Sequence, residues 1–584
     1  MFGFHGRYWR FDLSTGKGEM RTLPTSVLRA YLGGVGLGSW LLHREAPPGV
    51  DAFAPEAPLV FAFSPLVGTP LTTSAKFAVV AKSPLTGLLT DALSSSQFAI
   101  AGKRLGVDAI VLVGRCAAPS VLVDGALEPA RDWGRSAAET EAGLAGRGAV
   151  AAIGPAGERL VRFATVSHAG RHAGRGGLGA VMGAKQLKAI VVRGDTPTRL
   201  AEPERVRELA RDLVSRSRGA ATAKYREVGT VANLETFARV GALPVNNFSG
   251  GSAEGFGSLA VGTLRSERRH ERASCAACTI GCEHRYGHGD EMGRVEYESL
   301  FALGPLCGVR DAAVVLEASR RCDEWGLDTV SMGGTAAFAM ECGERGLLAG
   351  LPGFGDGEGL LDLIAAVGSR RGVGDLLAEG SRRAAAAVGG SAPSFANHVK
   401  GLELPGYEPR ALQTMALGLA VGTRGADHNR SGAYELDFSD RVDRLRGDER
   451  AARLAIEPED RAALIDSLIL CKFLRGVFTD LETEASELLQ AVTGFDVTAE
   501  ELRGVARRVV HLRKSFNIRE GWTPADDTLP ERILSEPISQ GPVAGARIDA
   551  TRLAAMVQAY NRARGWTDDG VPPPETEGDL LLDA

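Results

Sequence analysis

The 584-residue chain contains no long run of apolar residues, few aromatic side chains and few cysteines. No stretch approaches the roughly 18 consecutive apolar residues that a membrane-spanning helix needs. The net charge is −5 with both signs mixed along the chain, so composition gives no general case for binding nucleic acid or membranes. The opening residues, MFGFHGRYWRFDLSTG, lack the charged and apolar regions of a signal peptide, and we expect a cytoplasmic protein.

What is present is typical of a large globular protein. Hydrophobic residues make up 44% of the chain and charged residues 24%. Short β-branched runs bounded by Gly, Pro or Asp predict strands in the first 200 residues: APLVFAFSPL, AKFAVVAKS, DAIVLVGR, APSVLVDG and KAIVVRG. Apolar residues three and four apart then predict helices, among them AEPERVRELARDLVSRS, DAAVVLEASRRCDEWGLD, RAALIDSLILCKFL and TRLAAMVQAYNRARG. The sequence therefore predicts an α+β fold, β-rich at its start and mainly helical afterwards.

Three of the eight cysteines form one tight cluster, Cys275, Cys278 and Cys282, in the stretch ASCAACTIGCEH. In a large chain without a secretion signal, such a cluster favours metal binding over a disulfide framework. Both a tetrahedral zinc site and a cubane iron–sulfur cluster need four ligands. His284 would complete a zinc site, and Cys471 is another candidate for the fourth ligand, although a cysteine on an apolar helix face is more commonly a buried core residue. Spacing alone leaves iron–sulfur and zinc open.

Glycine is abundant, with 74 residues, and it clusters in runs such as GGVGLG and GRGGLG, which indicates backbone packed closely against other groups. The second run meets the G-x-G-x-x-G spacing of a dinucleotide site at Gly174, Gly176 and Gly179, with Asp195 about 20 residues on. A dinucleotide fold is not favoured, because HAGRHA separates the glycines from the preceding strand and the following helix is short. A phosphate cradle flanked by Arg171 and Arg175 remains plausible.

Two acidic motifs share one form. DEWGLD begins at Asp323 and DSLILC at Asp466, each with a leucine at the fifth position. A carboxylate can accept paired N–H bonds from a flat heterocycle such as a pterin, although each Asp alone is also typical of a helix cap. Glu296 and Glu298 in VEYES, and Arg424, His428 and Arg430 in GTRGADHNR, are candidate acid–base and anion-binding groups.

Taken in order, these motifs resemble the aldehyde:ferredoxin oxidoreductase family of tungsten–pterin enzymes over essentially the whole chain. The matching segments are YLGGVGLGSWLL, SPLTG, GRGGLGAVMGAKQLKAI, LPVNNF, the cysteine cluster, EYES, DEWGLD, LELPGYEPR, RGADH, DSLILC, IREG, DDTLP and RGW. The resemblance implies a double-sheet β-domain at residues 1–199 below two helical domains, 200–398 and 399–584, which together enclose a buried cofactor. It also implies that Cys471 is the fourth ligand of a 4Fe-4S cluster with Cys275, Cys278 and Cys282.

The resemblance further implies two pterins whose dithiolenes bind one tungsten, or less favourably molybdenum. By this likeness the cofactor-binding residues are Lys76, Ser95, Arg171, Ala173, Gly174, Arg175, Asp323, Leu327, Asp328, Arg424, Asn429, Arg430, Asp466 and Leu470. A magnesium ion is expected to bridge the pterin phosphates. Glu298, preferred to Glu296 by alignment alone, is the expected base, and His428 is expected to polarise the carbonyl or shuttle a proton.

The chain departs from the family pattern at several positions. Ile469 stands where the second motif usually has Gly, and family Arg, Asn and Gly positions of the β-domain are occupied by Lys76, Leu93 and Ser95. Lys76 keeps the charge but not the guanidinium fork, and Leu93 cannot hydrogen-bond. The intersubunit iron site of some members needs Glu-x-x-His, whereas this chain has Glu317 followed by Arg320, so we expect no such iron site and no dimer built on it.

The sequence therefore predicts oxidation of an aldehyde to a carboxylic acid, with electrons passed through the cluster to ferredoxin or an iron–sulfur subunit. The arginine-rich segment RSERRHERAS is a candidate docking surface for that acidic partner. One alternative is an aromatic acyl-thioester reductase of the benzoyl-CoA type. The other is a cofactor-free or zinc-binding scaffold, which Leu93 and Ile469 would support. Substrate identity and oligomeric state stay open.

Overall fold

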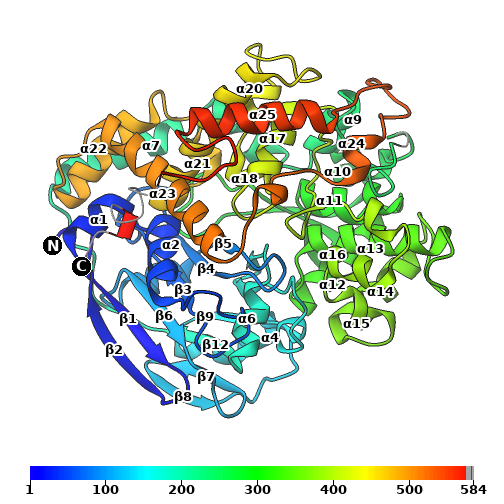
Figure 1. Ribbon diagram of the computed structural model, residues 1–584. Helices are drawn as coiled ribbons and strands as arrows, with labels where there is room; N and C mark the ends of the chain where they lie inside the picture. Colours follow the sequence, from blue (N-terminus) through cyan, green and yellow to red (C-terminus); the bar gives the residue numbers. More distant parts are fainter. Residues whose placement is uncertain (251–252, 574–579, 582–584) are drawn as a thin grey trace.

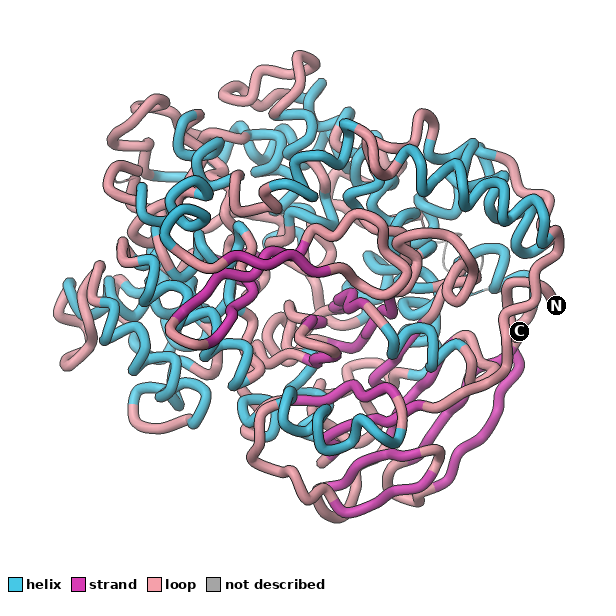
Figure 2. Tube along the Cα trace, turned by 180° about the vertical axis from the view of Figure 1, so that it is seen from behind, coloured by secondary structure: helices cyan, strands magenta, loops and turns pink. Residues whose placement is uncertain are grey.

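The computed structural model describes residues 1–250, 253–573 and 580–581. The first 192 residues hold two six-stranded sheets, coloured blue to cyan in Figure 1, and helices fill most of the rest. Seen from behind in Figure 2, strands gather in the lower part of the molecule and helices in the upper part. The predicted α+β fold is confirmed, including its order along the chain.

The first sheet has the strand order β2-β1-β6-β3-β4-β5. Its strands are β1 (Arg7–Asp12), β2 (Lys17–Thr22), β3 (Leu59–Ala62), β4 (Lys76–Lys82), β5 (Leu89–Ser95) and β6 (Ala109–Val113). Strands β1 and β6 pair in parallel, and the other neighbours pair antiparallel. Every residue of β3 and β6 is buried, because elements cover both faces of the sheet centre.

The second sheet has the order β11-β10-β9-β12-β7-β8. Its strands are β7 (Ser120–Val123), β8 (Ala126–Pro129), β9 (Ala149–Ile153), β10 (Val166–His168), β11 (Arg171–Ala173) and β12 (Leu187–Val192). The hairpin β10–β11 leads into the glycine-rich run, after which α6 (Leu178–Ala184) returns the chain to β12. This antiparallel hairpin before a seven-residue helix is not the strand–turn–helix unit of a dinucleotide fold, as the sequence indicated.

The helices form two groups above and beside the sheets (Figure 1). One group, drawn in green, includes α11 (Tyr297–Leu303), α12 (Ala312–Trp325), α13 (Thr329–Glu344), α14 (Gly357–Ser369) and α16 (Ser381–Val388). The other, drawn from yellow to red, includes α17 (Gln413–Val421), α21 (Ile456–Leu468), α22 (Leu481–Thr493), α23 (Ala499–Arg519) and α25 (Ala550–Ala563). Helix α7 (Pro203–Arg216) packs on α22 across the chain, and one contiguous hydrophobic core reaches from Phe4 to Leu580. The boundaries 199/200 and 398/399 stay predictions.

Two helix predictions differ in outcome. Helix α12 begins after the cap Asp311 and ends at Gly326, as its sequence pattern indicates. The prediction of one helix through RAALIDSLILCKFL is wrong at its end, because Ile469 adopts a left-handed conformation with φ 60° and terminates α21 at Leu468. A left-handed residue cannot continue a right-handed helix, and a β-branched residue rarely adopts that conformation.

The glycine run GGVGLG opens helix α2 (Gly34–Glu45), which covers the first sheet. A Cβ at Gly34 would lie 2.3 Å from the carbonyl oxygen of Asp466, and one at Gly38 would lie 2.6 Å from Val80. Bare backbone is therefore needed where α2 meets both the sheet and the end of α21. The predicted close packing of this run is confirmed.

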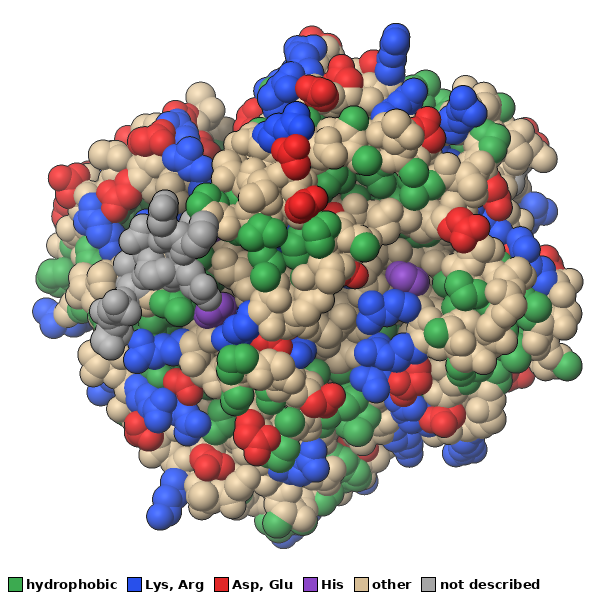
Figure 3. All heavy atoms as spheres, in the orientation of Figure 1, with side chains coloured by type: hydrophobic (Ala, Val, Ile, Leu, Met, Phe, Trp, Pro, Cys, Tyr) green, Lys and Arg blue, Asp and Glu red, His purple; other side chains and the backbone are tan. Residues whose placement is uncertain are grey.

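Within the described residues, no single helix is long and apolar enough to cross a membrane. The pair Tyr297–Cys307 and Ala312–Trp325 reaches the length and hydropathy of a span only when its two parts, bent by 119°, are counted together. In the space-filling view of Figure 3, basic and acidic side chains are interspersed over the face shown, in keeping with the mixed charge of the sequence.

Candidate active site

The four predicted cluster cysteines meet although Cys471 is remote in sequence. Cys275, Cys278 and Cys282 lie between β13 (His270–Ala273) and β14 (Glu283–His288), and Cys471 follows α21. A hydrogen bond with Cys278 lowers the pKa of Cys275 to about 5. Burial and the charge of Cys471 raise the pKa of Cys282. None of the four is in a disulfide, and Cys471 acts on the ionisation of Cys278 and Cys282, so the four thiols lie in one region. That they share one cluster stays a prediction.

The cysteine loop is fixed to the β-domain by hydrogen bonds. The backbone N–H of Thr73 donates to the carbonyl oxygen of Ala277 at 2.6 Å, and that of Ala276 donates to Oγ of Ser96 at 2.8 Å. Thr279 N–H donates to Oγ1 of Thr72 at 3.0 Å. The loop is thus fixed to the β-domain through its backbone N–H and carbonyl groups rather than through its thiols.

His284 does not join the thiols. One ring nitrogen, Nδ1, lies 2.7 Å from Nε2 of His270, and the other, Nε2, lies 3.1 Å from the carbonyl oxygen of Tyr225. Both nitrogens are therefore occupied. Within the described residues, no three Cys, His, Asp or Glu side chains converge closely enough to hold a single metal ion. Separated thiols suit a cluster whose ligands bind different iron atoms.

Lys76 and Ser95 face the thiols from paired positions on β4 and β5. The Ser95 side chain hydrogen-bonds with Cys275. Burial opposes charge on Lys76, but the thiols of Cys471 and Cys275 and the carboxylate of Asp466 together raise the pKa of its ammonium. Leu93, two positions before Ser95, is only partly buried and offers no polar atom.

The first Asp-led motif joins α12 to α13 against the β-domain. Gly326, at φ 76°, ends α12, and its carbonyl oxygen accepts the backbone N–H of Thr165 at 2.8 Å. Leu327 forms an isolated β-bridge with Ala164. Asp328 caps α13 by accepting the N–H of Ser331 at 3.1 Å. Asp323 Oδ1 lies 3.3 Å from Nε2 of His172 on β11.

The glycine-rich run after β11 lies beside this motif. Arg175 Nε is 3.5 Å from Asp328 Oδ2, and its other nitrogens donate to the carbonyl oxygens of Ala426 and Glu403, each at 2.6 Å. Ala173 ends β11 and Gly174 follows it, with no atom nearer than 3.7 Å to a Cβ placed on Gly174. Arg171 pairs with the buried Glu283. The structure therefore places these residues with the first motif.

The second Asp-led motif lies in a network of buried charges. Asp466 Oδ2 accepts from Arg430 at 2.8 Å and lies 3.4 Å from Lys472 Nζ. Arg430 also donates to Asp91 at 2.6 Å, as does Arg513 at 2.6 Å. Arg424 bridges Asp427 and the carbonyl oxygen of Asp91, and Asn429 accepts from Lys472. Burial opposes ionisation of Asp91, but its three arginines hold its pKa well below the usual range.

Sequence reasoning missed Asp91, Arg513 and Lys472. A signal existed for Asp91, which is the only charged residue in the strand sequence LTDALSS. Several buried atoms in this network, Arg424 Nε, Arg513 Nε and Asp466 Oδ1, have no hydrogen-bond partner among the described protein atoms. Such groups are rare unless a ligand or water satisfies them, so the residues fit a polar heterocyclic cofactor with acidic phosphates.

Glu298 and His428 meet in the wall of a cavity of about 310 Å³. Glu298 Oε1 lies 3.3 Å from Nδ1 of His428, and Glu298 Oε2 accepts the N–H of Gly406 at 3.0 Å. Burial raises the pKa of Glu298 to about 7 and lowers that of His428 to about 3. At neutral pH this gives a carboxyl group poised between its two forms beside a neutral imidazole.

Glu296 lines the same cavity but differs from Glu298 electrostatically. Arg294 pairs with Glu296 and lowers the pKa of its carboxyl group. A carboxylate held ionised in an ion pair is a weaker base than one whose pKa lies near neutrality. Phe473, two residues after Cys471, also lines the cavity, so the cavity adjoins the cysteine cluster.

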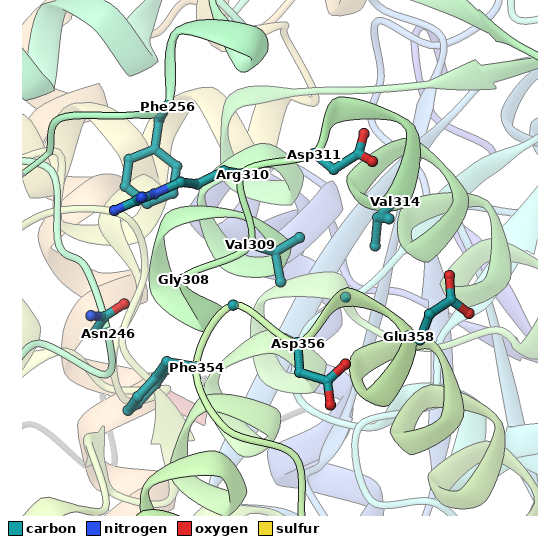
Figure 4. Close-up of a pocket in the computed structure, with 12 residues that line it drawn as sticks. Asn246, Phe256, Gly308, Val309, Arg310, Asp311, Val314, Phe354, Asp356 and Glu358 are labelled. Atoms are coloured by element: carbon teal, nitrogen blue, oxygen red, sulfur yellow. The ribbon is translucent and has the colours of Figure 1, made fainter.

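A larger cavity of about 710 Å³ lies elsewhere, at the start of α12 and α14 (Figure 4). None of the predicted site residues lines it. Its carboxylates Asp311 and Asp356 accept backbone N–H groups as helix caps, and Arg310 lies over the ring of Phe256 at 5.6 Å. These polar groups already make helix-cap and ring contacts within the protein, so we take the smaller cavity as the candidate active site.

The comparisons with known proteins place this chain, with its double-sheet base, among the oxidoreductases. A family model described as aldehyde ferredoxin oxidoreductase, N-terminal domain, matches residues 8–194. A second, for domains 2 and 3 of the same protein, matches residues 206–582. The chain belongs to the aldehyde ferredoxin oxidoreductase family, as the resemblance predicted.

Relatives and one solved structure match over full length. The tungsten-containing aldehyde ferredoxin oxidoreductase of Pyrococcus furiosus is 37% identical, with 98% of each chain covered. The protein of the same name from Thermococcus kodakarensis is 36% identical, with 99% of each chain covered. The active site complex BamBC of benzoyl coenzyme A reductase has the same fold, with a TM-score of 0.84 at 24% identity over 100% of this chain and 97% of that one.

Proposed function

We propose that the protein oxidises an aldehyde and water to a carboxylic acid, two protons and two electrons, with tungsten–pterin as cofactor. The names of the relatives above 30% identity support this reaction over acyl-thioester reduction or a scaffold role. The observation that carries the proposal is the Glu298–His428 pair, 3.3 Å apart in a cavity whose wall includes Phe473, two residues after Cys471.

The two Asp-led motifs are proposed to hold one pterin each. Asp323, Leu327 and Asp328 would hold the first, and Asp466 with Leu470 the second. Arg171, Ala173, Gly174 and Arg175, together with Lys76 and Ser95, would bind phosphates and a bridging magnesium. Arg424, Asn429 and Arg430 would support the second pterin. The metal held by the pterin dithiolenes supplies the centre that accepts the two electrons, and molybdenum in place of tungsten is the less favoured reading.

The chain's own acid–base groups would manage the protons. Glu298, ionised above about pH 7, takes a proton from the attacking water. His428 is neutral because burial lowers its pKa, and its Nε2 accepts from the side-chain nitrogen of Asn429 at 2.9 Å. Its Nδ1, beside Glu298, would therefore be the nitrogen that donates to the substrate carbonyl oxygen or shuttles a proton. The Gly406 N–H bond to Oε2 fixes the Glu298 carboxylate so that Oε1 is the basic atom.

Electrons would leave singly through a 4Fe-4S cluster on Cys275, Cys278, Cys282 and Cys471 to ferredoxin or a similar iron–sulfur partner. The candidate docking surface is the arginine-rich segment just before the cluster, with Arg265, Arg268, Arg269 and Arg272. Within the described part of the chain, none of these four arginines takes part in an ion pair. Unpaired surface cations steer an acidic partner and make its association rate depend on salt.

Substitution of the proposed base tests the function. We expect Glu298→Gln in the metal-loaded enzyme to lower kcat for aldehyde oxidation with a viologen acceptor by about 100-fold or more. In the unsubstituted enzyme, kcat/KM should rise with pH around a midpoint near 7, because Glu298 must lose its proton to act as a base.

Glu296→Gln is the matched control, because Glu296 lines the same cavity but is paired with Arg294. It should keep the pH midpoint and most of the activity. If Glu296→Gln removed the pH dependence and Glu298→Gln did not, the assignment of the base would be wrong. Iron and tungsten content measured on the same samples separates loss of the base from loss of the cofactor.

A further inference from the structure

The walls of the Glu298–His428 cavity are unusually aromatic. Seven of the sixteen residues that line it are tyrosine or phenylalanine, in a chain that is only 6% aromatic. Four of the eight tyrosines of the whole protein lie in this one cavity, Tyr225, Tyr297, Tyr407 and Tyr434. The enrichment at a single site requires an explanation beyond core packing.

The rings form a continuous path from solvent to the proposed acid–base pair. Phe438, with 43% of its surface exposed, stacks on Phe237 with ring centroids 5.4 Å apart. Phe237 contacts Tyr407 at 5.1 Å, and Tyr407 stacks on His428 at 4.7 Å and 26°. A planar ring moving along this path meets aromatic groups at offset-stacked and edge-to-face distances throughout.

The charged groups around the cavity are already engaged. Arg475 pairs with Glu435 and donates to the Tyr434 hydroxyl at 2.8 Å. Lys224 donates to the side-chain oxygen of Asn233 at 2.5 Å, and Glu296 pairs with Arg294. On the opposite wall, Tyr225 stacks on Phe473 at 3.9 Å. The charged groups of the lining are therefore satisfied within the protein, which disfavours phosphate-bearing aldehydes.

We propose that the preferred substrates are small uncharged aldehydes whose carbonyl is attached to an aromatic ring. The inference rests on the proposed function and narrows its substrate class. The ring of such an aldehyde would pack on the faces of Phe237 and Tyr407 that line the cavity while its carbonyl reaches Glu298 and His428. A volume of about 310 Å³ lies at the lower end of the range for small-molecule pockets and accommodates a ring-bearing aldehyde.

Substrate comparison on the metal-loaded enzyme tests the proposal. Benzaldehyde and cyclohexanecarbaldehyde have the same carbon skeleton, but only the first has a π-system. We expect kcat/KM for benzaldehyde to exceed that for cyclohexanecarbaldehyde by about tenfold, and that for acetaldehyde by more. Equal or higher values for the saturated ring would overturn the aromatic preference and leave aldehyde oxidation standing.

Phe438→Ala removes the outermost ring of the path at a partly exposed position, so the variant should fold. We expect KM for benzaldehyde to rise about three- to tenfold, with less than a twofold change for acetaldehyde. Phe2→Ala is the matched control, because Phe2 is 38% exposed and contacts Arg199 rather than the cavity. A rise in KM shared equally by both aldehydes would contradict a ring-stacking role for Phe438.

Binding of the product class gives a measurement independent of turnover. We expect benzoate, titrated calorimetrically into the enzyme, to bind more weakly to Phe438→Ala by about three- to tenfold and unchanged to Phe2→Ala. If no aldehyde were oxidised, the proposed function would fail, and this titration would still decide whether the cavity takes aromatic ligands. Absence of benzoate binding in an enzyme that oxidises aldehydes would overturn the inference alone.

Discussion

The two Asp-led motifs have the same form but are anchored differently. DEWGLD ends α12 at Gly326, whereas DSLILC ends α21 at Ile469, and both residues adopt the left-handed conformation, φ 76° and 60°. A glycine of the β-domain meets each helix end. A Cβ at Gly154 would lie 2.4 Å from the Trp325 carbonyl oxygen, as one at Gly34 would from that of Asp466 at 2.3 Å.

The difference lies in what surrounds the carboxylates. Asp323 is 39% exposed and meets His172, while Asp466 is fully buried among Arg430 and Lys472. The sixth residue also differs, because Asp328 caps the next helix and Cys471 joins the thiols. The same chain geometry thus serves two environments: a partly exposed carboxylate beside a histidine, and a fully buried carboxylate among cations. Because of this contrast, we expect the largest effects from substitutions in the second motif.

The largest effect is expected from substitution of Cys471, the sixth residue of the second motif. Cys471→Ala should remove the fourth thiolate of the proposed cluster, so that iron content and visible absorption of anaerobically purified protein fall by more than half. Cys116→Ala, a buried cysteine outside the cluster, should leave both unchanged. Full iron content in Cys471→Ala would refute the fourth-ligand role.

The next largest difference is expected between the two aspartates that begin the motifs, in their effect on the free energy of unfolding. Asp466→Ala leaves Arg430 and Lys472 partly uncompensated in the interior, which we expect to lower the free energy of unfolding by about 3–5 kcal/mol. Asp323→Ala removes a half-exposed contact and should lower it by about 1 kcal/mol or less. Urea unfolding measures the free energy of unfolding of both variants. Equal losses would contradict the predicted difference between the two carboxylates.

Exchanging the residue types at the two left-handed positions should lower stability at both, for different physical reasons. Gly326→Ile forces a side chain to within 3.0 Å of the Gly154 nitrogen in a disfavoured conformation, and we expect a loss of more than about 3 kcal/mol. Ile469→Gly relieves that conformation but deletes a fully buried side chain, so we expect a net loss of about 2 kcal/mol. A gain in stability for Ile469→Gly would mean that backbone strain dominates there.

The smallest effect concerns the helix cap of the first motif. Asp328→Ala should lower the free energy of unfolding by about 1 kcal/mol through loss of the α13 cap. Asp356→Ala is the matched control, because Asp356 caps α14 in the same way without a nearby arginine. A larger loss at Asp328 would measure what its burial and Arg175, 3.5 Å away, together add to the cap.

Much of the fold was predictable from local pattern. The strands from β3 to β12 named by β-branched runs are present, and so are α7, α12 and α25. The end of α21 was not predictable, because Ile469 has no local signal for a left-handed conformation that tertiary contacts impose. The family match is confirmed by the comparisons, whereas the roles of individual site residues remain predictions.

Prediction of the candidate site from the sequence has a similar limit. Sequence motifs brought Asp466 and Arg430 into view, but not the Asp91–Arg513 ion pair, because its partners lie 422 residues apart. Alignment alone chose Glu298 over Glu296, and the structure adds a physical reason in the Arg294 ion pair that only Glu296 makes. At Glu317, where no iron site is expected, Arg320 and Arg321 donate to the carboxylate, and the absence of iron stays a prediction.

The distance in sequence between the cysteines has a consequence for biosynthesis. Three thiols emerge together, but Cys471 follows Cys282 by 189 residues. At roughly 5–20 residues per second, a ribosome needs about 10–40 s to deliver it. Throughout that interval the nascent chain presents an incomplete, reactive thiol set, so a cluster with all four protein ligands can be completed only after α21 has been made. Maturation of this centre would then require that at least the first 471 of the 584 residues have been synthesised.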